Sequence, residues 1–157
     1  MEMLFLKVHY SSDKHTWETP KDFFNKLNNI FSFTLDACAE HHTAKVGCFY
    51  TKEQDSLNQD WKGVVYCNPP YGREQIKFIT KAYEEYIKHN STIVILIPAR
   101  PDTKVWQDVI FPTASQVCFV RGRLRFGDSK ENAPFPCALV VFSSDLVNLS
   151  SFGYCIK

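Results

Sequence analysis

Several features that would indicate export or a membrane role are missing from this sequence. The first residues lack the positively charged start and the long apolar segment of a secretory signal peptide. No apolar run approaches the roughly 20 residues that a membrane-spanning helix needs. Excess positive charge is missing as well, because the formal net charge is only +1, so no overall basic field indicates a nucleic-acid ligand. These absences predict a cytoplasmic protein without a membrane partner.

Repeats, low-complexity tracts and inter-domain linkers are also missing. The 157 residues are therefore expected to form one domain, with residues 1–16 as a loosely held arm. The six cysteines include no pair with the two-residue gap of a zinc knuckle, so they are expected to be reduced thiols. Zinc binding by Cys38, His41, His42 and Cys48 is the alternative that we do not favour, and we expect no metal.

The most informative stretch is the one in which a short apolar run leads directly into Asn68-Pro69-Pro70-Tyr71-Gly72. Neither proline can donate to a sheet, so a strand must end here and continue as a stiff turn. In open α/β sheets, ligands bind at the carboxyl ends of the strands. The Asn68 side-chain oxygen and the Pro69 carbonyl can each accept one hydrogen of a planar amino group, while the Tyr71 ring stacks on its heterocycle. We therefore interpret Asn68, Pro69, Pro70 and Tyr71 as candidate catalytic residues, although such turns also occur for purely structural reasons.

The motif Asn68-Pro69-Pro70-Tyr71 matches the (D/N/S)-P-P-(Y/F) motif of amino-group methyltransferases that use S-adenosylmethionine. The chain as a whole resembles the phage DNA N-6-adenine methyltransferase family. This resemblance extends over most of the sequence, through Trp17-Glu18-Thr19-Pro20, Phe33-Thr34-Leu35-Asp36-Ala37 and Pro134-Phe135-Pro136. It implies S-adenosylmethionine as the cofactor, double-stranded DNA as the partner and methylation of the N6 amine of a flipped-out adenine. A glutamine-N5 or RNA-base methyltransferase, and a non-catalytic nucleic-acid-binding protein with the same fold, are the alternatives.

Residues ahead of the motif are the candidates for binding the cofactor. The resemblance assigns Trp17, Thr19 and Pro20 to the cofactor site, with Thr19 and Pro20 beside the methionine end. It also places Asp36 and Ala37 where related enzymes bind S-adenosylmethionine, and Asn68 borders the same site. No G-x-G fingerprint follows Asp36, so the residues alone give a weak signal there. Asp55 is our candidate for holding the ribose hydroxyls or the adenine amine of the cofactor, unless it only caps a helix or turn.

The order of apolar segments predicts an α/β protein with a Rossmann-like methyltransferase fold. Its sheet is expected to be mostly parallel, with antiparallel strands near the C-terminus. Thr19 and Pro20 suit the N-cap and first position of a helix that follows them. The other predicted helices are 73–90, with Ile76, Ile79, Tyr83, Tyr86 and Ile87 on one face, and 102–110. The predicted strands end at 37, 67, 97, 120 and 126, and segments 136–142 and 152–156 are expected to form a terminal hairpin. Only 31 residues separate Asp36 from Asn68, so the first half of the fold must be abbreviated.

Positive charge is concentrated in the second part of the chain. Residues 1–60 hold 6 basic and 9 acidic side chains, whereas residues 61–157 hold 12 and 8. The clearest basic cluster is Arg121, Arg123, Arg125 and Lys130, and Arg100 and Lys104 are further candidates for contacting DNA. Alternation would place the three arginines on one face of a strand. A solvated edge strand explains the same pattern, since charge on an edge prevents aggregation.

The proposed chemistry needs neither a metal nor a covalent intermediate, because the leaving group of a sulfonium methyl donor is already positively charged. Two oxygen acceptors on a stiff turn would orient the target amine with little reorganisation. Asn68 is always neutral and cannot act as a strong base, so the mechanism must depend on orientation. A homodimer is a possible assembly, because so small a chain would need a second copy to surround a duplex.

Overall fold

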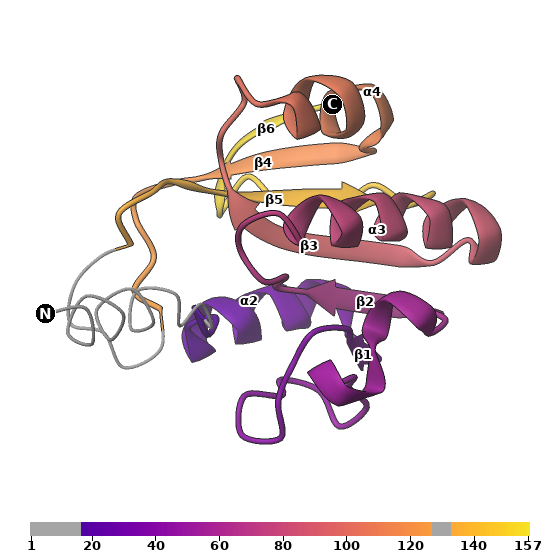
Figure 1. The fold of residues 1–157 in the computed structure, drawn as a ribbon. Coiled ribbons are helices and arrows are strands. Elements are labelled where there is room, and N and C mark those ends of the chain that lie inside the picture. The colour runs from indigo at the N-terminus through magenta and orange to yellow at the C-terminus, as the bar shows by residue number, and fades with distance from the viewer. Residues whose placement is uncertain (1–16, 127–132) are drawn as a thin grey trace, which may run out of the picture.

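The computed structural model describes residues 17–126 and 133–157. The predicted arm 1–16 and Lys130 lie outside these residues. The described strands form one six-stranded sheet in the order β1-β2-β3-β5-β4-β6 (Figure 1). Their bounds are β1 Leu35–Asp36, β2 Val64–Cys67, β3 Thr92–Pro98, β4 Gln116–Val120, β5 Cys137–Phe142 and β6 Gly153–Ile156.

The sheet is parallel at its start and mixed towards its end. β1 pairs parallel to β2, and β2 pairs parallel to β3. β5 is antiparallel to both of its neighbours, β3 and β4, so β4 runs in the same direction as the first three strands. β6 then pairs antiparallel to β4. The prediction of an α/β sheet with a parallel start and antiparallel strands near the C-terminus is confirmed, and the carboxyl ends of β1 to β4 share one edge.

The predicted terminal hairpin is wrong. β5 and β6 do not pair with each other, because β4 lies between them and hydrogen-bonds to both. The connection from Phe142 to Gly153 instead crosses to the far side of β4, where Phe119 pairs with Tyr154. Adjacent segments of similar apolar character favoured a hairpin. The strand ending at residue 120 was predicted, but nothing in the sequence indicates that it lies between the other two.

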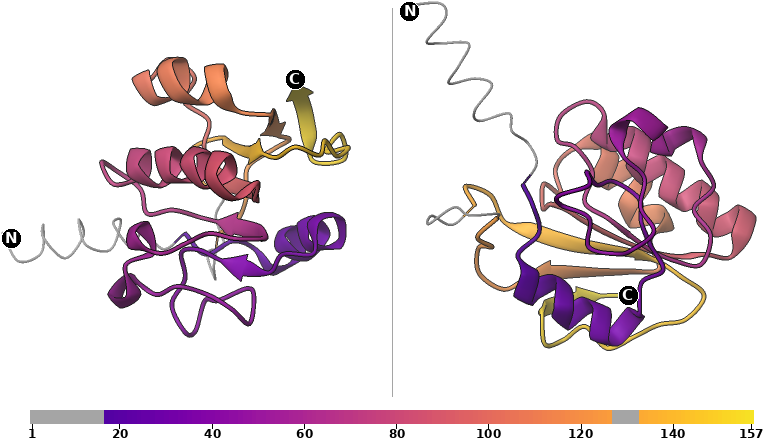
Figure 2. Two further views of the ribbon diagram at one scale, coloured as in Figure 1. Left: turned by 90° about the vertical axis from the view of Figure 1, so that its right-hand side faces the viewer. Right: turned by 90° about the horizontal axis from the view of Figure 1, so that it is seen from below.

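Helices cover both faces of the sheet. Helix α2 (Lys21–Phe31) lies on one face, and α3 (Gln75–His89) lies on the other with the π-helical turn η3 (Trp106–Ile110) and the short α4 (Phe111–Thr113), as Figure 2 shows. Because side chains alternate along a strand, Ile93, Ile95 and Ile97 of β3 join the core beneath α3. Val94 and Leu96 join the core beneath α2. β3 is therefore buried on both faces, as its continuous apolar run predicts. Among the described residues, no helix is long and apolar enough to cross a membrane.

The buried face of α3 differs from its predicted apolar face. Ile79 is buried, but Ile76 and Ile87 are 45% and 63% exposed. Glu85 is buried instead, because its carboxylate accepts the backbone N–H of Trp61 at 2.5 Å. A buried acceptor for a buried backbone donor thus explains why a charged residue lies on the buried face of this helix.

The segment between β1 and β2 is short, as predicted. Phe49 forms a single parallel bridge with Asp36. Two 3₁₀ turns follow, η1 (Lys52–Gln54) and η2 (Ser56–Asn58). This compact connection lies beside the carboxyl ends of β1 and β2, where it encloses the site described next.

Candidate active site

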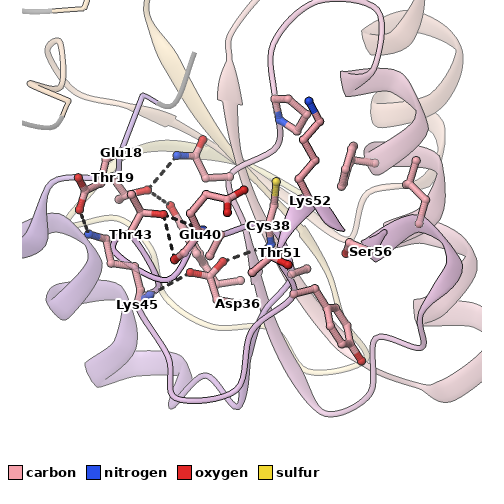
Figure 3. A pocket seen from close by; sticks show the side chains of 18 of the residues that line it. Glu18, Thr19, Asp36, Cys38, Glu40, Thr43, Lys45, Thr51, Lys52 and Ser56 are labelled. Atoms are coloured by element: carbon pink, nitrogen blue, oxygen red, sulfur yellow. Dashed lines mark hydrogen bonds and ion pairs between the residues drawn. The ribbon is translucent and has the colours of Figure 1, made fainter. Parts of the chain in front are cut away.

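A cavity of about 640 Å³ opens at the carboxyl ends of β1 and β2. This volume is typical of small-molecule sites. Figure 3 shows Glu18 and Thr19 on one side, Lys52 and Ser56 on the other, and Asp36 between them. The sequence-predicted residues that line the cavity are Thr19, Asp36, Ala37, Asp55, Asn68 and Pro70. Most of the predicted cofactor set is therefore brought together by the fold.

Asp36 supplies the most deeply buried carboxylate of the cavity. It ends β1 and is only 2% exposed. Its two oxygens accept the backbone N–H groups of Lys45 at 3.0 Å and Cys38 at 3.4 Å. Burial raises its pKa to about 6, although these hydrogen bonds and the Lys45 charge oppose the shift. A carboxylate that is costly to ionise and borders a cavity is typical of a ligand-binding group.

The side-chain nitrogen of Asn68 makes two hydrogen bonds, and neither of them uses the side-chain oxygen. Its side-chain Nδ2 lies 2.6 Å from the main-chain oxygen of Trp17 and 3.3 Å from Oγ1 of Thr19. A carbonyl oxygen can only accept, so the atom facing Trp17 must be the amide nitrogen, and Oδ1 points elsewhere. That Oδ1 is buried and meets no hydrogen-bond partner among residues 17–126 and 133–157. A buried acceptor without a partner costs free energy, so a ligand donor is expected to complete it.

Thr19 does not act as the predicted helix N-cap. Helix α2 begins at Lys21 after Pro20, and no side chain caps its first turn. The hydroxyl of Thr19 instead lies 2.5 Å from the hydroxyl of buried Tyr66 and accepts from Asn68. The hydroxyl of Thr19 therefore bonds to two side chains at the site and does not cap the helix, which is the role that its position before Pro20 favours.

Tyr71 lies outside the cavity, in an aromatic group with three other rings. Its ring stacks on Trp17 with a centroid distance of 6.3 Å and meets Phe135 edge-on at 5.3 Å. Phe126 completes the group through its contact with Trp17. The Tyr71 hydroxyl is buried and has no hydrogen-bond partner in the part of the chain that the structure describes, and burial raises its pKa well above the usual value. Trp17, predicted as a cofactor residue, is therefore placed beside Tyr71 rather than among the residues that line the cavity.

Asp55 borders the cavity and stands at the N-cap position of η2, although its side chain makes no capping hydrogen bond there. It is exposed and joins the turns η1 and η2 in a left-handed conformation, with φ of 52°. Its carboxylate also accepts Nδ2 of Asn58 at 2.5 Å. Pro20 and Pro69, by contrast, are not among the residues that line the cavity.

The basic cluster is exposed but is not part of a strand, so its predicted alternation is wrong. β4 ends at Val120, and the left-handed Gly122, with φ of 75°, turns the chain away from the sheet. Arg121, Arg123 and Arg125 then lie on irregular backbone. Arg123 donates to the main-chain oxygen of Ala133 at 3.2 Å. Phe126 turns inward, 3% exposed, into the aromatic group around Trp17.

The cluster nevertheless lies at the same sheet edge as the motif. Arg121 follows the carboxyl end of β4, as Asn68 follows that of β2. Exposed Arg100 and Lys104 follow the carboxyl end of β3. Arg100 is close enough to Tyr71 to oppose the rise of its pKa that burial causes. Positive side chains therefore border the edge at which a large anionic ligand would reach the motif.

Several site residues were missed by sequence reasoning. Lys45 borders the cavity, donates its backbone N–H to Asp36 and forms an ion pair with Glu18 at 2.8 Å. It lies in an aperiodic loop, so no spacing rule identifies it. Tyr66 was interpreted only as a strand residue. Residues i and i+2 of a strand share a face, which is the one signal that could have linked Tyr66 to Asn68.

Metal-ligating side chains gather elsewhere. In ranges 17–126 and 133–157, the one group with suitably close ligand atoms is Asp60, Glu85 and His89, within 4.8 Å. This group lies at the opposite edge of the sheet, where Glu85 already accepts from Trp61 and lies 3.7 Å from the ammonium of Lys81. In the same ranges, the alternative zinc ligands Cys38, His41, His42 and Cys48 do not form a group of this kind.

Comparison with known proteins agrees with this geometry. Residues 8–151 match the family model described as DNA N-6-adenine-methyltransferase (Dam). The chain belongs to this family. It is 35% identical over 141 residues to the DNA N-6-adenine-methyltransferase of Haemophilus phage HP1, which covers 83% of this chain and 80% of that protein. It is also 36% identical over 63 residues to the putative methyltransferase YfdM of Escherichia coli K12, covering 35% of this chain and 69% of that protein. The predicted resemblance to the phage family is thereby confirmed.

Proposed function

We propose that the chain transfers a methyl group from S-adenosylmethionine to the N6 amine of an adenine that has been flipped out of double-stranded DNA. The observation that supports it most is the buried Oδ1 of Asn68, which borders the cavity and accepts no hydrogen bond from any described residue. An exocyclic amine supplies a donor for it. Membership of the adenine-specific family narrows the amine to that of adenine.

Asn68 would act by orienting the target amine. Its own Nδ2 is already engaged by Trp17, so the side chain can only accept from the substrate. We assign the second acceptor to the carbonyl of Pro69 on the same stiff turn. Two fixed acceptors in line with the N–H bonds favour a nitrogen lone pair directed at the methyl group, with little reorganisation. Tyr71 would then stack on the flipped base, whose unstacking costs a few kcal/mol.

The cavity fits the cofactor in volume and in the chemistry of its lining. Bound S-adenosylmethionine supplies an electrophilic methyl group on a positively charged sulfur. Asp36 would hold a positive or donor group of the cofactor, and Asp55 would accept from its ribose hydroxyls. Thr19, bonded to Asn68, would place the cofactor beside the target acceptor. The sheet would accordingly be a shortened Rossmann-like methyltransferase sheet with its ligands at the carboxyl edge.

Cofactor binding is expected to depend on pH through Asp36. Its pKa is raised to about 6, so the carboxylate is protonated below that pH and ionised above it. Affinity for the positively charged cofactor should therefore rise about tenfold per pH unit up to about 6 and then level off. Calorimetric titration across this range measures it.

The matched variant for this test is Asp36→Asn. It should bind S-adenosylmethionine about 10- to 100-fold more weakly at neutral pH, the range for losing a charged hydrogen bond, and show no rise through pH 6. Parallel binding curves for the two proteins would remove Asp36 from the cofactor site.

DNA binding is expected to use the arginines after β4. Replacing Arg121, Arg123 and Arg125 together by alanine should weaken binding and reduce the slope of log affinity against log salt by up to about 3, roughly one per lost phosphate contact. Fluorescence anisotropy with a labelled duplex at several salt concentrations measures the slope. A double Lys62→Ala and Lys88→Ala variant, which removes exposed charges at the opposite edge, is the control and should leave the slope unchanged. An identical slope in the arginine variant would exclude this cluster from the interface.

Radiolabelled methyl transfer tests the function itself. Duplex DNA, RNA and a protein mixture are offered side by side, and labelled nucleosides are separated after digestion. We expect label only in the N6-methyladenine of DNA. In the cell, we expect the reaction to take place in the cytoplasm of a bacterial host. Label in RNA or in protein glutamine would instead establish one of the alternative amino-methyltransferase functions.

A further inference from the structure

The contact between Asn68 and Trp17 distinguishes the amide from a carboxylate at position 68. The main-chain oxygen of Trp17 lies 2.6 Å from Nδ2 of Asn68. That oxygen has no hydrogen and can only accept, so the atom facing it must donate. The (D/N/S)-P-P-(Y/F) motif allows either aspartate or asparagine at its first position. The contact with Trp17 requires a hydrogen-bond donor there, which asparagine has and an ionised aspartate lacks.

We propose that the main-chain carbonyl of Trp17 makes position 68 specific for an amide, and that Trp17 is a positioning residue that turns Oδ1 of Asn68 towards the target amine. This inference rests on the proposed function, because it concerns how the same acceptor is presented. Its structural part, a donor-requiring contact at position 68, can be measured without any substrate.

The hydroxyl of Thr19 does not distinguish an amide from a carboxylate at position 68. This hydroxyl accepts from Asn68 at 3.3 Å and also meets the hydroxyl of Tyr66 at 2.5 Å. Tyr66 is 1% exposed, and either hydroxyl can be the donor in this contact. Because a threonine hydroxyl can both donate and accept, Thr19 can serve a carboxylate as well as an amide. Discrimination therefore falls to the Trp17 carbonyl.

An aspartate at position 68 would place two oxygens 2.6 Å apart. In its ionised form it would be repelled by the carbonyl and would have to rotate away. In its protonated form it could donate to Trp17 and still offer its other oxygen to the amine, as Asn68 does. Asn68→Asp should therefore work only as the neutral acid, which is the opposite of what a carboxylate base would require.

Other titrating groups near this position are common to both proteins. Asp36 and Tyr66 come from β1 and β2, and the ion pair of Glu18 with Lys45 borders the same cavity. Among the described residues, further titrating groups beside the turn or the cavity are Cys38, Glu40, Tyr50, Lys52, Asp55, Cys67, Tyr71, Glu74, Arg100 and Cys137. Dividing the rate of the variant by that of the wild type at each pH cancels their shared contributions.

The kinetic test compares methyl transfer by Asn68→Asp and wild type from mildly acidic to alkaline pH, with saturating DNA and cofactor. We expect the ratio of rates to fall about tenfold per pH unit once the pH exceeds the pKa of the introduced carboxyl. A ratio that stays constant or rises with pH would overturn the proposal. Cofactor binding by the variant, measured at each pH, reports that its fold is retained.

Two measurements by NMR separate this inference from the proposed function. The carboxyl carbon of the introduced aspartate should titrate well above the ordinary pKa of roughly 3.9, and an ordinary or lowered value would overturn the proposal. In the wild type, the side-chain amide protons of Asn68 should exchange slowly with solvent, more slowly than those of exposed Asn29. Rapid exchange at Asn68 would also overturn it, even if Asn68→Asp failed to fold. Absence of methyl transfer by the wild type would instead refute the proposed function alone.

Discussion

Replacing Asn68 by alanine is expected to reduce the rate of methyl transfer by roughly 100- to 1,000-fold, the range seen when one preorganised catalytic hydrogen bond is removed. The expectation follows from the buried Oδ1, which has no partner among the described residues and would be the main side-chain acceptor for the target amine. Single-turnover assays with saturating cofactor measure the chemical step directly. Binding of S-adenosylmethionine, measured by calorimetry, should change by only a few-fold, because Asp36 and the rest of the lining remain.

The matched control is Asn29→Ala, since Asn29 is exposed on helix α2 and the same side-chain atoms are removed. Its transfer rate should equal that of the wild type. A normal rate for Asn68→Ala would refute the assignment of Asn68 as the acceptor. A loss of cofactor binding equal to the loss of rate would indicate that Asn68 serves the cofactor instead.

The position of the motif could be predicted because its physics is local. Two adjacent prolines end a strand wherever they occur, and the apolar run before them identifies the strand. The carboxyl edge of a parallel strand is then a general place for ligands. Asn68 was predicted at this edge for this reason, whereas Asp36 was assigned to the site by the family resemblance. The structure brings both to one cavity.

The roles of individual side chains could not be predicted where distant residues compete for them. Thr19 has the sequence signature of an N-cap, but Tyr66 and Asn68, 47 and 49 positions away, take its hydroxyl. The arginines after β4 alternate like a strand, but Gly122 adopts a left-handed conformation that ends the ladder. In both cases a local preference was overridden by contacts that no single stretch of sequence contains.

Trp17 shows the same limit for a functional residue. The family resemblance assigned Trp17 only to the cofactor site, whereas its main-chain oxygen accepts from the amide of Asn68 and its ring packs on Tyr71. Main-chain atoms are the same in every residue, so a role of this kind leaves no trace in the sequence. It becomes visible only when the chain before α2 is seen beside the end of β2.

Gly153→Ala is expected to destabilise the fold by about 3 kcal/mol, the upper end of typical overpacking costs. A Cβ at this position would lie 1.8 Å from the main-chain oxygen of Phe119 and 2.9 Å from the nitrogen of Arg121. Both are backbone atoms of β4 and its end, so neither can move aside as a flexible side chain would. Accommodating the methyl group requires β6 to separate from β4, which breaks the pairing of Gly153 with Val120. Urea unfolding should show a lower midpoint with an unchanged slope.

Gly47→Ala is the matched control, because a Cβ there meets nothing within 4 Å. The same substitution should therefore leave the free energy of unfolding within about 1 kcal/mol of the wild-type value. Any change should be towards greater stability, because alanine makes the unfolded chain less flexible. Gly153 is far from Asn68 along the sheet order, at the edge strand opposite β1. The folded fraction of Gly153→Ala at low temperature should consequently transfer methyl groups at the normal rate, whereas Asn68→Ala stays folded and inactive. Equal midpoints for the two glycine variants would show that β6 adapts to the added methyl group without leaving the sheet.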